Sequence, residues 1–186
     1  MKARIDLMHV TPGVMQAMFG LERQVRQAGF DHRLLDLVRM RASQINGCSY
    51  CLDMHSKDAR ANGETEQRLY GLDAWRETPY YSARERAALE WTEALTLVSE
   101  THAPDDVYER VREQFSEAEL VHLTLAIVAI NGWNRLNIAA RTVPGDYVCS
   151  GRPVDGPPFE TAVTDPSGCG PCRCGDGECT AAFGEN

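Results

Sequence analysis

The sequence has few of the features that would suit a membrane or a nucleic acid. No uninterrupted apolar run approaches the roughly 18–20 residues that a transmembrane helix requires. Lysine and arginine number 19 against 27 aspartates and glutamates, so the formal net charge is −8. This acidic balance argues against nucleic acid or an anionic membrane as the main partner. The first residues also lack the pattern of a secretory signal, and we expect a soluble, cytoplasmic protein.

Strand-like alternation of apolar and polar residues is also missing, and helical spacing takes its place. Thr11 and Pro12 predict a helix start, and Gly29 predicts its end. Further helices are expected over Asp31–Gln44 and Cys48–Ala61, and the helix-breaking pair Asn46-Gly47 separates them. The sequence therefore predicts an all-α protein.

The second half continues the helical pattern and then stops abruptly. Ser116 and Glu119 form a capping-box pattern ahead of an apolar segment that runs to Ala140. We expect this segment to be buried on all sides, either centrally or at a subunit contact. After Tyr147 the chain becomes rich in Gly, Pro, Asp and Cys. We therefore predict a helical domain over residues 1–147 and an irregular cysteine-rich tail over 148–186.

Seven cysteines are present, in a protein expected to work in a reducing compartment, where cysteine pairs more often serve catalysis or metal binding than cross-linking. Cys48 and Cys51 lie at the predicted start of a helix, where unpaired amides favour a thiolate. His55 follows on the same helical face and could carry the thiol proton. This combination favours a redox-active dithiol. Half of a zinc site, or thiols that merely fill the core, remain open alternatives.

The other cysteines belong to the C-terminal part. Four of them fall within eleven positions and could wrap one soft metal ion such as Zn(II) or Cu(I); they are Cys169, Cys172, Cys174 and Cys179. The same thiols could instead exchange electrons with Cys48, or the tail could have no defined role. The spacing alone does not choose among these three interpretations.

The stretch from Leu34 to Arg60, which contains Gln44-Ile45-Asn46-Gly47-Cys48-Ser49-Tyr50-Cys51, resembles the carboxymuconolactone decarboxylase family. More narrowly, it resembles the AhpD-like alkylhydroperoxidase branch. The agreement extends over about residues 1–147 and includes four further stretches, namely Gly63–Leu69, Ala74–Pro79, Arg84–Glu100 and Asn131–Leu136.

The resemblance implies an AhpD-like helical bundle that forms trimers or hexamers and reduces hydroperoxides without haem or flavin. It implies that Cys51 is oxidised to a sulfenic acid and that Cys48 resolves it as a disulfide. A dithiol partner then reduces this disulfide. His55 would be the proton relay, together with Asp36 at a position where the family commonly carries glutamate.

Two departures and two alternatives qualify this interpretation. Asp36 is one methylene shorter than the family's glutamate, and Tyr50 stands where peroxidase members place a histidine. A phenol with a pKa near 10 is a poor proton carrier at neutral pH. A decarboxylase or other lyase is one alternative, because the family name covers both activities. A non-enzymatic oligomer that senses metal or redox state is the other.

Overall fold

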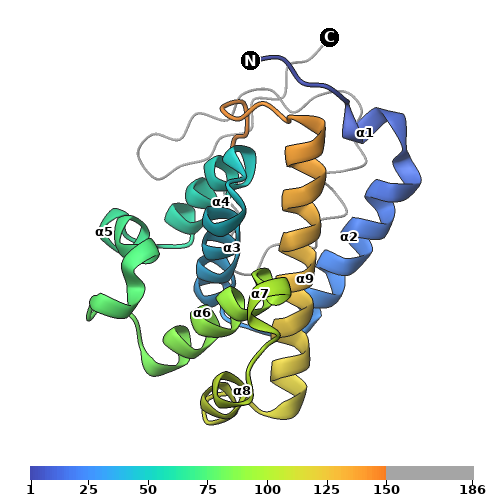
Figure 1. Ribbon diagram of the computed structural model, residues 1–186. Helices are drawn as coiled ribbons and strands as arrows, with labels where there is room; N and C mark the ends of the chain where they lie inside the picture. Colours follow the sequence, from blue (N-terminus) through green and yellow to red (C-terminus); the bar gives the residue numbers. More distant parts are fainter. Residues whose placement is uncertain (150–186) are drawn as a thin grey trace.

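The computed structural model describes residues 1–149, and within that range all the regular secondary structure is helical (Figure 1). The all-α prediction is therefore confirmed. No helix in residues 1–149 is both long and apolar enough to cross a membrane. The four tail cysteines expected to bind metal lie outside the described residues. The tail's metal content and the domain boundary near residue 147 thus stay predictions.

The first four helices comprise a short one that was not predicted, followed by three that match the expected breaks closely. They are α1 (Leu7–Val10), α2 (Pro12–Gln27), α3 (His32–Asn46) and α4 (Ser49–Ala61). Gly47 ends α3 in a left-handed conformation, with φ at 68°, and its N–H bonds to the carbonyls of Gln44 and Ser43. Glycine adopts this conformation without steric cost, so the chain can turn from α3 into α4 within two residues. Cys48 consequently occupies the N-cap of α4.

The remaining elements follow α4 along the chain. They are α5 (Glu66–Tyr70), the 3₁₀ helix η1 (Gly71–Glu77), α6 (Ala83–Thr96), α7 (Val98–Thr101), α8 (Asp105–Arg112) and α9 (Glu117–Ala140). The capping box predicted at Ser116 and Glu119 is present, and a second one joins Ser82 to Glu85. Each box satisfies backbone donors that a helix start otherwise leaves unpaired.

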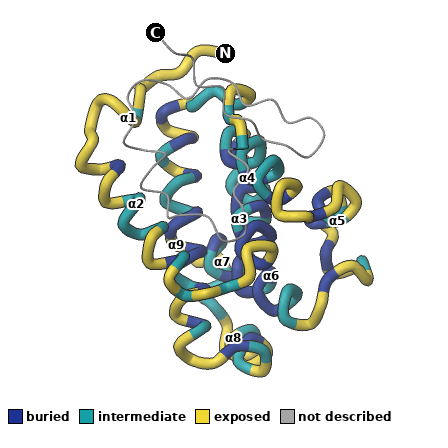
Figure 2. The backbone as a smooth tube through the Cα atoms, turned by 180° about the vertical axis from the view of Figure 1, so that it is seen from behind, coloured by how far each residue is buried: buried dark blue, intermediate teal, exposed yellow. Residues whose placement is uncertain are grey.

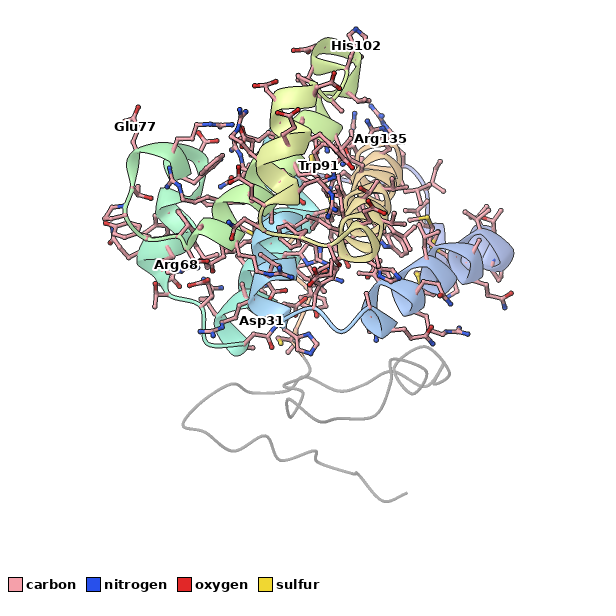
Figure 3. The ribbon with its side chains drawn as sticks, turned by 90° about the horizontal axis from the view of Figure 1, so that it is seen from below. Asp31, Arg68, Glu77, Trp91, His102 and Arg135 are labelled. Carbon is pink, nitrogen blue, oxygen red and sulfur yellow. A yellow bond between two sulfur atoms is a disulfide. The ribbon has the colours of Figure 1, made fainter. Side chains whose placement is uncertain are left out.

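The long helix α9 runs between α2 on one side and α3 on the other (Figure 1). Buried residues line the inward faces of α3, α6 and α9, whereas α1 and the outer turns of α2 are exposed (Figure 2). Trp91 lies between the helices in the view from below (Figure 3), and it packs with Val38, Phe115 and Leu123 in one core cluster. The cysteine-bearing helix α4 packs in turn against α3 and α9.

The outer face of α9 departs from the expected all-round burial. Val121, Val128 and Ile138 are exposed, by 67%, 53% and 45%. The neighbouring helices cover only part of the circumference of α9, so a single chain leaves this apolar stripe in contact with solvent. Of the two expected alternatives, a central position buried on all sides within one chain is contradicted, and a subunit contact along these residues stays a prediction.

Candidate redox site

Cys48 and Cys51 form a disulfide at the start of α4. Their Cα atoms lie 5.4 Å apart, within the usual range for a disulfide. Each residue is only 1% exposed. The sequence prediction that these two thiols can pair is therefore matched by their positions, and the pair lies beneath the surface.

The environment of Cys48 follows from its N-cap position. Its sulfur accepts a hydrogen bond from the backbone N–H of Cys51 at 3.4 Å, the role that an oxygen plays in a serine or aspartate cap. Backbone donors and the positive end of the helix dipole both favour negative charge there. Once the disulfide is reduced, this setting stabilises a thiolate on Cys48.

A second donor reaches the other sulfur from α9. The side-chain Nδ2 of Asn137 lies 3.7 Å from Sγ of Cys51 and also donates to the Trp133 carbonyl at 2.9 Å. The bond to Trp133 fixes the amide so that its N–H group, a donor, faces the sulfur. Sequence reasoning missed Asn137. The available signal was a polar residue on the buried face of a helix that is rich in apolar residues.

A polar network behind the cysteines ties α9 to the end of α3. Asn134 donates to Ser43 at 3.0 Å, and Asn46 donates to both Asn134 and Asn131 at 2.9 Å. Asn134 is fully buried. Satisfied buried polar groups of this kind favour one arrangement of the helices, and this network holds α9 against the end of α3.

His55 lies one helical turn after Cys51 and is buried. Its Nδ1 has no hydrogen-bond partner within the described chain, and it lies 3.9 Å from Oδ2 of Asp58. Burial, assisted by the positive charge of Arg39, lowers the pKa of His55 to about 3. The imidazole is therefore neutral at neutral pH, and it can accept a proton only transiently.

Asp36 lies further along α3, beside Arg39. Its Oδ2 accepts a hydrogen bond from Asn62 at 2.7 Å, and its Oδ1 is 3.8 Å from Arg39. Burial raises the pKa of Asp36 above its ordinary value, in spite of the opposing hydrogen bond from Asn62. Among the described contacts none is a hydrogen bond between Asp36 and His55. The structure thus brings Cys48, Cys51 and His55 onto one helix but leaves Asp36 bonded elsewhere.

Arg39 is a further charged group that the sequence analysis did not single out. Its guanidinium bonds to Glu22 at 2.9 Å, and Glu22 also accepts the indole N–H of Trp133 at 3.1 Å. Arg39 is thereby held between carboxylates on α2 and α3 while its charge acts on His55. This ties the electrostatics of the histidine to the packing of α2, α3 and α9.

Tyr50, which stands in place of the histidine of peroxidase members, is half-buried. Burial raises the pKa of its phenol, and the carboxylates of Asp53 and Asp58 add to the effect. The phenol therefore stays protonated at neutral pH. It can donate a hydrogen bond but does not serve as a base.

No cluster of three histidine, cysteine or acidic side chains suited to a metal occurs in residues 1–149. A hollow of about 530 Å³ lies elsewhere, between the α2–α3 connection and the start of α6. Its three arginines already have acidic partners, which are Asp31 for Arg33, Glu64 and Glu85 for Arg68, and Glu119 for Arg84. None of the cysteines described above lines it.

Residues 1–149 combine an all-helical fold with a buried CxxC disulfide at a helix start and a histidine one turn later, and these features define the class of protein. The model of the carboxymuconolactone decarboxylase family matches residues 12–94. YdfG of Bacillus subtilis, an uncharacterised protein, is 44% identical over 139 residues, covering 75% of this chain and 95% of YdfG. The chain belongs to the carboxymuconolactone decarboxylase family.

Solved structures agree with this assignment. A protein of unknown function from Agrobacterium tumefaciens, described as a candidate AhpD antioxidant defence protein, is 42% identical with a TM-score of 0.76. That match covers 78% of this chain and 100% of the other. An uncharacterised peroxidase-related protein from Ralstonia eutropha, described as an alkylhydroperoxidase AhpD core, shares the fold with a TM-score of 0.66 at 17% identity. This match covers 75% of this chain and 74% of the Ralstonia chain.

Proposed function

We propose that this protein is a thiol-dependent hydroperoxide reductase that cycles Cys48 and Cys51 between dithiol and disulfide. The observation that carries the proposal is the buried Cys48–Cys51 disulfide at the N-terminus of α4, with His55 one turn away. Both the amide of Asn137 and the helix start supply hydrogen bonds that favour negative charge on sulfur.

The reaction begins at Cys51. Its thiolate attacks one oxygen of the hydroperoxide, the O–O bond breaks, and the leaving oxygen takes a proton to depart as water or an alcohol. Cys51 is thereby oxidised by two electrons to a sulfenic acid. The Cys48 thiolate then attacks the Cys51 sulfur, the disulfide forms, and the sulfenic oxygen leaves as water.

His55 moves the proton in this scheme, and a dithiol restores the reduced state. The neutral imidazole takes the thiol proton and returns it to the leaving oxygen. Asp36 remains a candidate for the relay, acting on His55 from a distance through Arg39. An external dithiol, a protein or a small molecule, then reduces the disulfide by thiol exchange. No haem, flavin or metal is required for these steps.

We also propose a homo-oligomer, a trimer or a hexamer, that covers the exposed apolar stripe of α9. Cytoplasmic location stays a prediction from the sequence. The decarboxylase alternative gives no role to a redox-active dithiol. It therefore predicts that alkylation of Cys48 and Cys51 leaves the activity intact.

The test is consumption of hydrogen peroxide and of an organic hydroperoxide by fully reduced protein, with thiols counted before and after. We expect two thiols to be lost per subunit at the Cys48–Cys51 pair, identified by mass spectrometry of the alkylated peptides. Cys51→Ser should abolish peroxide consumption. Cys149→Ser, which changes a cysteine outside the pair, is the matched control and should leave consumption unchanged. Turnover retained by Cys51→Ser would refute the proposal.

A further inference from the structure

The face of α4 that carries Cys51 and His55 also carries a third polar group, Asp58. The three residues occupy positions i, i+4 and i+7, and side chains at this spacing lie on one side of a helix. Oδ2 of Asp58 is 3.9 Å from Nδ1 of His55, about 1 Å beyond a hydrogen bond. A small rotation of either side chain closes this gap.

The chain that follows α9 returns to α4 and holds Asp58 in place. The hydroxyl of Tyr147 donates to Oδ1 of Asp58 at 2.7 Å, which leaves Oδ2 turned toward the histidine. Two neighbouring residues anchor the same segment. Lys57 donates to the carbonyls of Gly145 and Tyr147 at 3.2 and 2.8 Å, and the Gly145 N–H donates to Asp53 at 3.1 Å.

The other carboxylate near the site is already occupied. Asp36 accepts a hydrogen bond from Asn62 and faces Arg39, whereas Nδ1 of His55 is buried without a hydrogen-bond partner in the described chain. A buried ring nitrogen that lacks a hydrogen-bond partner is costly, so the ring needs a partner on its Nδ1 side. Asp58 is the carboxylate that the structure places within reach of that nitrogen.

We infer that Asp58 accepts the Nδ1–H of His55 and so fixes the tautomer whose Nε2 is the proton acceptor, with Tyr147 as the positioning residue for Asp58. This inference rests on the proposed function, because Nε2 would serve the thiol of Cys51. The proton passes from Cys51 to Nε2 and from there to the departing oxygen of the hydroperoxide. Asp58 does not change its own protonation state. A carboxylate that orients an imidazole in this way recurs in unrelated catalytic sites.

The test reads the tautomer directly, by two-bond ¹H–¹⁵N correlation of the imidazoles in reduced protein labelled with ¹⁵N-histidine. His55→Gln identifies the signals of His55. In the wild type we expect the Nδ1–H tautomer. Asp58→Ala should shift His55 toward Nε2–H, and Asp58→Glu should restore the wild-type pattern. Tyr147→Phe keeps the ring, removes only the bond to Asp58, and should give a mixed population.

Asp53→Asn is the matched control, since Asp53 anchors the same segment through Gly145 but has no hydrogen bond to His55. It should leave the tautomer unchanged. In the peroxide assay we expect Asp58→Ala to lose about 10- to 100-fold in the rate of Cys51 oxidation, the range found for carboxylates that orient metal-binding histidines. Tyr147→Phe should lose less, and Asp53→Asn should stay near the wild-type rate.

An Nε2–H tautomer in the wild type would overturn the inference, as would an unchanged Nδ1–H tautomer in both Asp58→Ala and Tyr147→Phe. If Asp58→Ala fails to fold, as judged by circular dichroism, Tyr147→Phe alone decides. The NMR result is independent of turnover. A protein that consumes no peroxide but shows the expected tautomers would refute the proposed function and support the His55–Asp58 pair.

Discussion

Asn137 offers a quantitative test of how the protein sets the reactivity of Cys51. A hydrogen bond to a charged acceptor contributes about 1.5–3 kcal/mol, and the 3.7 Å separation from a sulfur atom argues for the lower end. Because about 1.4 kcal/mol corresponds to one pKa unit, Asn137→Ala should raise the pKa of the Cys51 thiol by about one unit. A thiolate with a higher pKa is also a better nucleophile, with a Brønsted coefficient of about 0.4–0.5.

These two effects oppose each other, and their balance changes with pH. Well below the thiol pKa, Asn137→Ala should react with iodoacetamide about threefold more slowly, because tenfold less thiolate is only partly offset by its greater nucleophilicity. Well above both pKa values it should react about threefold faster. The two rate profiles must therefore cross.

The measurement uses a Cys48→Ser background, so that Cys51 is the only thiol of the pair, and follows its peptide by mass spectrometry. Asn134→Ala is the control, because Asn134 is equally part of α9 but bonds to Ser43 and Asn46 and not to a sulfur. It should destabilise the protein without moving the Cys51 profile. Profiles that do not cross, or an equal shift in Asn134→Ala, would refute the reasoning.

Three further predictions concern stability. Since burial and Arg39 hold the pKa of His55 at about 3, the unfolded chain binds one proton more between about pH 3 and 6.5. The free energy of unfolding should therefore decrease as the pH is lowered through that window, by up to about 1.4 kcal/mol per pH unit. In urea titrations, His55→Gln should show a weaker dependence of this free energy on pH below about 6.5. The contribution of Asp36 to the pH dependence of stability has the opposite sign. Its raised pKa means that the folded state holds the extra proton, so stability is lost as pH rises through the folded pKa, and Asp36→Asn should remove this loss. Ser116→Ala should cost about 1 kcal/mol in urea unfolding, because the capping box of α9 disappears; an unchanged midpoint would contradict that role.

Much of the fold was predictable because the residues that start and end its helices act locally. Pro12, Gly47 and the Ser116–Glu119 pair each act within one helical turn, and each marks a boundary that the structure contains. The placement of Cys48 and Cys51 at a helix start followed from the same local rules. The burial of α9 was less predictable. Its apolar character shows that some partner is needed, whereas the number of neighbouring helices in one chain depends on the packing of distant segments.

The surroundings of the cysteines depend on such distant contacts. Asn137 reaches Cys51 from 86 positions away, and Tyr147 reaches Asp58 from 89 positions away. Neither contact can be inferred from the spacing of neighbouring residues in the sequence. Asp58 is the exception, because its position on the face of Cys51 and His55 could have been read from helical periodicity. The family pattern directed attention to Asp36 instead, and the structure places the amide of Asn62 on that carboxylate.

The near-complete enclosure of both sulfurs has a consequence for the timing of the proposed cycle. A hydroperoxide is small enough to reach a cysteine through brief openings of the packing. A reductant of protein size must bring its own sulfur in line with the disulfide, and at 1% exposure of the two cysteines this requires a larger opening of the packing around them. Oxidation and reduction therefore differ in the size of opening they require. We expect the molecule to admit oxidant quickly, to wait in the disulfide form, and to be returned to the dithiol at a rate that its own opening motions set.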